Sequence, residues 1–217
     1  MRLTRYLTEC LGTLLLLAIV TGSGHMGQTL SDGNDAVALL GNSIATGAGL
    51  FVLIGLLGPV SGAHFNPVVS LMFWWVRALS TRDLLAYVVV QCLGAVLGVW
   101  LVHVLFDLPI LQLSQKARAG LPMMVSEWVS TLVLLTVIWL GVRQRNDRVP
   151  LYVALTVTAG YWFTSSTFFA NPAVTLARSL TDTFVGISWT DVPGFWLGQL
   201  AALLFIGLVL RHRTSDN

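Results

Sequence analysis

The sequence predicts an all-α membrane protein, in which six transmembrane helices and two re-entrant half-helices form an inverted repeat. Three observations lead to this prediction. Charged residues make up only 10% of the 217 residues, whereas soluble domains carry about 25%. The apolar residues lie in six long runs, and two similar Asn-Pro segments divide the chain into halves. A soluble domain would need a larger charged surface, so the sequence excludes a soluble protein.

The six apolar runs are candidates for transmembrane helices, since a helix needs roughly 20 residues to cross the bilayer. They cover residues 6–21, 36–57, 84–106, 123–142, 151–169 and 195–210. The first run follows a basic start and could pass for a signal peptide, but Glu9 lies inside it and five further runs follow. We therefore expect residues 1–217 to form one membrane domain.

The basic residues predict the orientation of the helices. Six spans place both termini on one side of the membrane, and nine of the 12 Lys and Arg residues fall on that side. These nine are Arg2, Arg5, Arg77, Arg82, Arg143, Arg145, Arg148, Arg211 and Arg213. Because cytoplasmic loops carry the excess of Lys and Arg, both termini are expected in the cytoplasm.

Charge, cysteines and histidines exclude several classes of function. The net charge of +2 is too small and too scattered for a nucleic-acid groove. Cys10 and Cys92 both lie in apolar runs, so neither a disulfide framework nor a metal site is expected. The four histidines lack metal-ligand spacing, and no enzyme motif accompanies them. We expect no cofactor, no metal and no enzymatic activity.

The two Asn-Pro segments belong to a longer internal repeat. Residues 66–71 read Asn-Pro-Val-Val-Ser-Leu, and residues 171–176 read Asn-Pro-Ala-Val-Thr-Leu. The match extends to polar residues inside the apolar runs, which pair as Glu9 with Glu127 and Gln91 with Gln199. The chain is thus two copies of a unit of about a hundred residues.

Each copy contributes three spans, so the copies, residues 1–110 and 118–217, must have opposite orientations in the membrane. About ten mostly apolar residues follow each Asn-Pro, too few to cross the bilayer. Asn suits an N-cap and Pro suits the first helical turn, so each segment is expected to form a half-helix. The preceding backbone, residues 58–65 and 164–170, is expected to be non-helical and to line a water-filled path.

With its paired motifs, inverted repeat and two intramembrane glutamates, the chain resembles the aquaporin or major intrinsic protein family over nearly its whole length. Residues 61–67, Ser-Gly-Ala-His-Phe-Asn-Pro, are also close to the family's usual approach to its first motif. The resemblance implies that the pore motifs are Asn66, Pro67, Val68, Asn171, Pro172 and Ala173. It implies pore-lining loop backbone at Ala63, His64, Phe65, Phe169 and Ala170.

The resemblance also implies a mechanism. Half-helices that meet at the midplane aim their positive ends at one point of the pore, which disfavours cations there. Asn66 and Asn171 would donate hydrogen bonds to a passing water oxygen and so interrupt proton transfer along the file. Glu9 and Glu127 would be structural carboxylates that accept hydrogen bonds from loop backbone; a proton or ion path is the alternative. Val68, where the motif usually has Ala, adds bulk either to the pore or to the packing.

The expected outer selectivity filter departs from the family pattern, because Val174 replaces the arginine that usually follows the second motif. Counted from the two motifs, the filter positions are Thr46, Ala159 or Gly160, Phe168 and Val174. No histidine occupies the position in the fifth span where water-selective members commonly have one. The implied constriction is less polar and wider than theirs, as in members that admit polyols or metalloid hydroxides.

Arg178 lies one helical turn beyond Val174, and two interpretations of it stay open. A helical side chain leans toward the N-terminus, so Arg178 could reach back and partly replace the missing cation of the filter. Alternatively, it extends to the outer headgroups or pairs with Asp182.

A passive channel for water and small neutral solutes such as glycerol-like polyols, closed to protons and ions, is the function that the resemblance implies. A metalloid-hydroxide channel of the arsenite type is the alternative within the class. Inverted repeats with broken helices also build secondary transporters, and Phe65, Phe168 and Val174 could occlude the path of a non-conducting scaffold. The implied partners are water, small neutral solutes, the lipid bilayer and three further copies in a homotetramer. The expected location is a prokaryotic cytoplasmic (inner) membrane.

Overall fold

A computed structural model of the chain describes residues 2–214, and within that range every regular element is a helix. The elements are α1 (Arg2–Leu30), α2 (Asp35–Ser61), α3 (Pro67–Trp75), α4 (Thr81–Leu105), α5 (Leu121–Arg143), α6 (Val149–Phe163), α7 (Pro172–Arg178), the 3₁₀ helix η1 (Trp189–Asp191) and α8 (Val192–Thr214). Side chains are described as far as residue 209, so those of Arg211 and Arg213, which the positive-inside argument used, lie outside the description.

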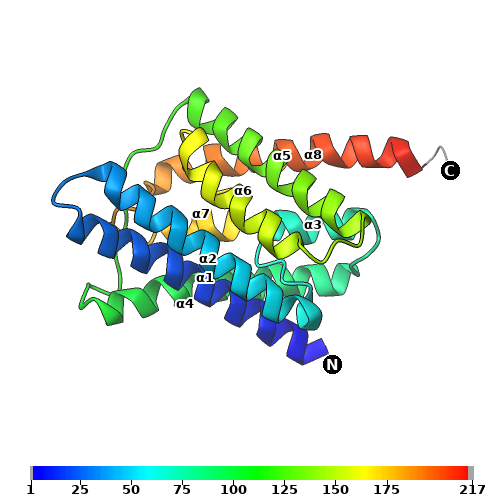
Figure 1. Cartoon of the computed structure of the whole chain (residues 1–217), viewed down its shortest axis with the longest axis horizontal. Coiled ribbons are helices and arrows are strands. Elements are labelled where there is room, and N and C mark those ends of the chain that lie inside the picture. The colour runs from blue at the N-terminus through cyan, green and yellow to red at the C-terminus, as the bar shows by residue number, and fades with distance from the viewer. Residues whose placement is uncertain (1, 215–217) are drawn as a thin grey trace.

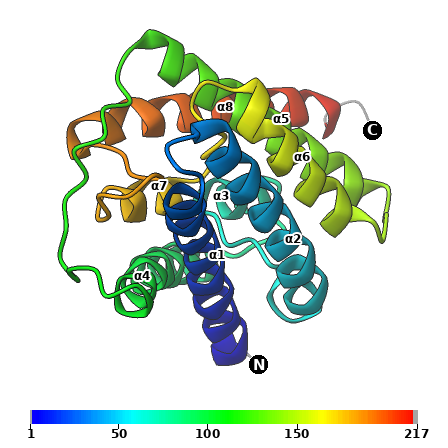
Figure 2. The ribbon, with the colours of Figure 1, turned by 60° about the vertical axis from the view of Figure 1, so that its left-hand side comes forward.

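The helices form two groups that enclose the half-helices (Figures 1 and 2). In the first group α1 packs against both α2 and α4, and in the second α5 packs against both α6 and α8. Contacts between α2 and α6 join the groups, and α3 and α7 lie between them. The start of α1 and the end of α8 lie at the same end of the bundle (Figure 1), as six crossings require. This architecture confirms the predicted fold class.

Small residues allow the long helices of each group to cross closely. A Cβ at Gly94 of α4 would collide with the backbone carbonyl of Cys10 in α1, and one at Gly98 with that of Leu14. In the second group, a Cβ at Gly198 of α8 would collide with the carbonyl of Met124 in α5. Such contacts bring helix backbones together where lipid tails provide no hydrophobic drive for association.

Five of the predicted spans are long and apolar enough to cross a membrane, but the fifth in chain order, α6, is short. It has 15 residues, a rise of about 22 Å against a hydrocarbon core of about 30 Å. The predicted span of residues 151–169 was therefore wrong at its end. From Thr164 the chain is non-helical, and Thr167, Phe168 and Ala170 have positive φ angles that a right-handed helix excludes.

The first non-helical segment also begins later than predicted. Residues 58–61 belong to α2, which runs through Pro59 and ends at Gly62 in the left-handed conformation, with φ of 93°. Glycine adopts this conformation without steric cost, so Gly62 terminates the helix. The second segment, residues 164–170, is non-helical as predicted.

The half-helices α3 and α7 have nine and seven residues, and they begin alike. Asn66 is the N-cap of α3 and Asn171 that of α7, and a proline occupies the first helical position of each. The side-chain oxygen of Asn66 accepts from the N–H of Val68, and that of Asn171 accepts from the N–H of Ala173. Both motifs thus start helices by the same local chemistry.

Candidate functional site

One cavity of about 120 Å³ follows the meeting line of the two halves. Its walls come from α1, α2, α5, α6, both half-helices and the loops that precede them. Most of the lining is aliphatic or aromatic. The polar side chains that line it are Thr46, His64, Asn66, Tyr161, Asn171 and Arg178. A narrow apolar tube with a few polar groups can pass a solute only where those groups replace its lost hydration.

Asn66 and Asn171 tie the two half-helices together within this cavity. The amide nitrogen of Asn66 donates to the carbonyl of Ala170 at 2.7 Å, and that of Asn171 donates to the carbonyl of Phe65 at 2.8 Å. Each carboxamide carries a second N–H hydrogen, and both residues line the cavity. Two N–H donors are therefore available to a solute oxygen between the half-helices.

The loops before α3 and α7 have the same unusual backbone. Ala63 and Phe65 have φ of 48°, and the residues at the same distances before Asn171, namely Phe168 and Ala170, have φ of 57° and 47°. Each left-handed non-glycine residue costs on the order of 1–3 kcal/mol, so the surrounding structure must hold these conformations in place.

Glu9 holds the loop before α3. Its carboxylate is fully buried and accepts from the backbone N–H groups of His64 at 2.9 Å and Phe65 at 2.7 Å. It also accepts from the hydroxyl of Ser61 at 2.7 Å and the amide of Gln91 at 2.8 Å. All these donors belong to the scaffold, which is the arrangement that a structural carboxylate requires.

Glu127 holds the loop before α7 in the same way. It is fully buried and accepts from the N–H groups of Phe169 at 3.0 Å and Ala170 at 2.9 Å. The amide of Gln199 donates to it at 2.6 Å and also reaches the hydroxyl of Thr175 in α7. Neither glutamate lines the cavity, so the geometry favours the structural interpretation over an ion path.

Three of the predicted filter positions, Thr46, Phe168 and Val174, line the cavity. The two candidates in the fifth span do not. Ala159 has an exposed side chain, and Gly160 packs against the ring of Phe168, where a Cβ would collide with it. The cavity-facing side of α6 follows a four-residue spacing that leads to position 161, so these two positions lie away from the cavity.

Tyr161 occupies the place that was expected for Ala159 or Gly160. Its hydroxyl lies 3.2 Å from that of Thr46, and both line the cavity. Val153 and Val157 precede it at helical spacing on the same face. That spacing was visible in the sequence and could have identified Tyr161, whereas the count from Asn171 fails because α6 ends early.

Arg178 reaches the cavity. It is 2% exposed, and its Nε donates to the carbonyl of Val185 at 2.5 Å. The guanidinium carbon lies 3.4 Å from the centroid of the Phe169 ring, a close cation–π contact. Its two terminal nitrogens make no hydrogen bond to other described residues, while Asp182 accepts instead from the backbone N–H of Gln115. The geometry fits the interpretation in which Arg178 faces the filter and not the headgroups.

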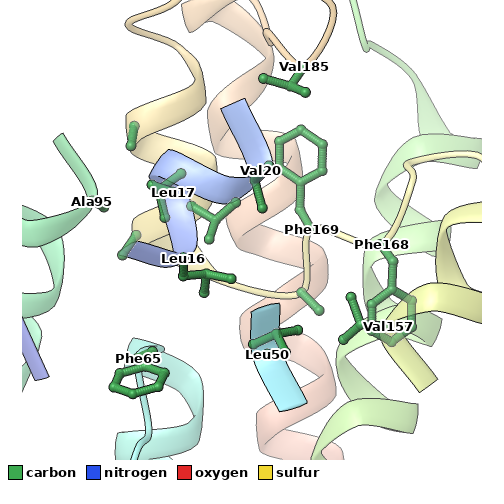
Figure 3. Close-up of a cluster of buried hydrophobic side chains, with 14 of the residues drawn as sticks. Leu16, Leu17, Val20, Leu50, Phe65, Ala95, Val157, Phe168, Phe169 and Val185 are labelled. Atoms are coloured by element: carbon green, nitrogen blue, oxygen red, sulfur yellow. The ribbon is translucent and has the colours of Figure 1, made fainter. Parts of the chain in front are cut away.

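The rings of Phe168 and Phe169 diverge from adjacent positions (Figure 3). Phe168 points toward Val157 of α6, and Phe169 points toward Val185 in the segment after α7. Both residues are buried and line the cavity. Phe168 has a left-handed backbone conformation, its ring lies against α6, and the ring of Phe169 contacts Arg178.

The opposite end of the cavity has a matching pair. His64 lies two residues before Asn66, and Phe169 lies two residues before Asn171. Phe73 lies seven residues after Asn66, and Arg178 lies seven residues after Asn171. The rings of His64 and Phe73 stack at 4.7 Å with an interplanar angle of 17°, and both line the cavity. Sequence reasoning missed Phe73, although the repeat aligns it with Arg178.

Val68 does not line the cavity. It is fully buried in a cluster with Met72 of α3, Leu135 of α5 and Leu203 of α8, while its neighbour Val69 faces the cavity. The additional bulk relative to Ala therefore lies in the packing between the half-helix and two long helices, and not in the path.

The fold is a six-helix inverted repeat whose two half-helices are joined through their Asn-Pro caps, and a cavity lies at this junction. These features define a class of membrane proteins with channel architecture. The sequence comparison identifies the family: the model described as major intrinsic protein matches residues 2–210, and the chain belongs to that family.

Individual relatives agree with this assignment. An aquaglyceroporin, AqpS, of Rhizobium meliloti (strain 1021) is 52% identical over 196 residues, which cover 90% of this chain and 84% of the relative. Aquaporin-2 of Rattus norvegicus is 28% identical over 95% of this chain and 77% of its own. The X-ray structure of the aquaglyceroporin from Plasmodium falciparum superposes with a TM-score of 0.74 over the whole of both chains at 19% identity, which shows a shared fold.

Proposed function

We propose that the protein is a passive channel for water and small neutral solutes of the glycerol type. The observation that carries the proposal is the cavity between the halves, with Asn66 and Asn171 donating across it and Arg178 at one end. The relative named an aquaglyceroporin, 52% identical, supports polyols as part of the solute range. No enzymatic step, cofactor or bound metal is required.

Passage follows from the exchange of hydrogen bonds. A solute that enters the apolar tube loses water, and the free N–H hydrogens of Asn66 and Asn171 replace part of its hydration. Carbonyls of the two loops supply acceptors, because their left-handed residues turn the backbone away from helical bonding. A water that accepts from both asparagines cannot easily relay a proton, and the positive ends of the half-helices and Arg178 oppose cations.

We further propose a division of the residues into roles. The pore motifs are Asn66, Pro67, Val68, Asn171, Pro172 and Ala173, with Val68 and Ala173 acting through packing. The filter consists of Thr46, Tyr161, Phe168, Val174 and Arg178. The chain forms one channel domain with repeats at about residues 1–110 and 118–217, and it works as a homotetramer in a cytoplasmic membrane with both termini in the cytoplasm.

Light-scattering measurements on proteoliposomes test this function. Vesicles with and without the protein are challenged with sucrose, glycerol or a neutral metalloid hydroxide, and shrinkage and reswelling are followed in a stopped-flow instrument. We expect faster water loss than in empty vesicles and reswelling with glycerol that does not saturate.

Each other outcome selects another function. Flux equal to that of empty vesicles would identify a non-conducting scaffold. Saturable flux that follows an ion gradient would identify a secondary transporter. Reswelling with the metalloid hydroxide alone would make that the dedicated solute, an alternative that rests on the missing arginine at Val174.

A further inference from the structure

Three basic residues bind three consecutive backbone carbonyls beyond α7. The carbonyls belong to residues 184–186, in the segment between α7 and η1. The pairs are Lys116 Nζ with the carbonyl of Phe184 at 2.7 Å, Arg178 Nε with that of Val185 at 2.5 Å, and Arg118 Nε with that of Gly186 at 2.8 Å. Two of these side chains come from the connection between α4 and α5, so this connection and α7 are joined through one short segment.

Arg118 and Arg178 also share the ring of Phe169. The guanidinium carbon of Arg178 lies 3.4 Å from its centroid, and that of Arg118 lies 5.3 Å from it. Phe169 and Arg178 line the cavity, whereas Arg118 does not. Arg118 is still buried, with only 9% of its surface exposed. Its backbone N–H donates to the Asp191 carboxylate at 2.7 Å. A buried, anchored guanidinium thus stands behind the ring on which Arg178 rests.

Resting on the proposed channel function, we infer that Arg118 is a positioning residue, which holds Arg178 at the filter and thereby sets the solute selectivity. Arg178 has two protein partners near its charge, the Val185 carbonyl and the Phe169 ring. Arg118 holds the next carbonyl and touches the same ring, so it restrains both partners at once.

The charge of Arg118 also favours a position of Arg178 toward the cavity. Burial lowers the pKa of Arg118 to about 10, and Glu127 opposes that shift, so the side chain remains charged at neutral pH. Two like charges in a partly desolvated site repel each other. Because Arg118 is outside the cavity and Arg178 lines it, the repulsion favours positions of Arg178 toward the cavity.

A double-mutant cycle tests the inference. The glycerol-to-water permeability ratio is measured in proteoliposomes for the wild type, Arg118→Ala, Arg178→Ala and the double variant. We expect each single substitution to change the ratio by about threefold or more, and the double variant to match Arg178→Ala alone, since coupled residues are not additive. Gln115→Ala, from the same connection and with an exposed side chain that donates to the Leu113 carbonyl, is the matched control and should leave the ratio within the error.

Three results would overturn the inference. One is an effect of Arg118→Ala that persists unchanged when Arg178 is already alanine. Another is a loss of thermal stability in Arg118→Ala with an unaltered ratio, which would make Arg118 merely structural. The third concerns Arg118→Lys, which keeps the charge and one donor and is used if the alanine variant fails to fold. We expect a wild-type permeability ratio for Arg118→Lys, and a ratio like that of Arg178→Ala would contradict the inference. A wild-type protein that conducts neither water nor glycerol would contradict the proposed function as well. A conducting wild type in which Arg118 and Arg178 are not coupled would contradict this inference alone.

Discussion

At the α3 end of the cavity His64 stacks on Phe73, and at the α7 end Phe169 carries Arg178. Both pairs come from the same two positions, two residues before and seven residues after the capping asparagine. The backbone beneath them is also alike, with left-handed residues three and one before each asparagine. The ends differ in the chemistry that they offer to a solute.

That difference shows what a duplicated scaffold fixes and what it leaves free. A buried glutamate, a bent loop and an Asn-Pro cap recur in each half, because they satisfy backbone groups that cannot be left unpaired inside a membrane. The side chain seven residues along is under no such demand. The cavity therefore has an aromatic ring at one end and a guanidinium at the other.

The largest effect is expected from the shared part of the two ends, the glutamates. Glu9→Ala and Glu127→Ala each leave two loop N–H groups, buried or part-buried, without an acceptor, at about 1–3 kcal/mol apiece. We expect each variant to lower the free energy of unfolding in detergent by about 3 kcal/mol or more. Thr29→Ala, exposed on α1, is the control. A loss below about 1 kcal/mol in either half would break the equivalence of the loops.

Glycines that face the loop aromatics test whether the two ends are packed alike. A Cβ at Gly12 would collide with the ring of Phe65, and one at Gly160 would collide with that of Phe168. We expect Gly12→Ala and Gly160→Ala each to cost about 1–3 kcal/mol of unfolding free energy. Gly55→Ala, where the space is open, should be neutral or stabilising. Unfolding that is unchanged in one of the two variants would show that its aromatic ring can move aside.

Replacing the guanidinium makes the two ends alike. Arg178→Phe removes the donors that face the cavity, and hydrogen bonds to a charged group contribute about 1.5–3 kcal/mol. We expect glycerol permeability in proteoliposomes to fall about tenfold, since 1.4 kcal/mol of barrier is a factor of ten. Phe73→Arg is the reciprocal variant. Glycerol permeability that rises in Arg178→Phe would contradict a role of Arg178 in binding the solute.

The smallest effect is expected at Val68, which aligns with Ala173 of the second motif. Because Val68 is buried against α5 and α8 and does not face the cavity, Val68→Ala should cost about 1–2 kcal/mol of unfolding free energy. The permeability ratio of glycerol to water should not change. An altered ratio with unaltered stability would place this residue in the path after all.

Much of the site could be predicted because it depends on local chemistry. Asparagine is favoured at the N-cap and proline at the first helical position, so both half-helices could be predicted from the Asn-Pro pairs. The glutamates could be paired from the repeat, and their buried bonds to loop backbone agree with the structural interpretation. Ala159 and Gly160 lie away from the cavity, because counting residues from a motif ignores where a helix ends and which face it turns inward.

The sequence by itself determined the class of this protein: apolar runs with few charges, divided by two related Asn-Pro segments, allow only a membrane bundle with an inverted repeat. The tertiary structure decided which side chains meet. Tyr161 faces Thr46 from another helix, and Arg178 rests on Phe169 beside Arg118. Periodicity and capping are properties of neighbouring residues, whereas such contacts depend on how helices far apart in the chain are rotated and packed.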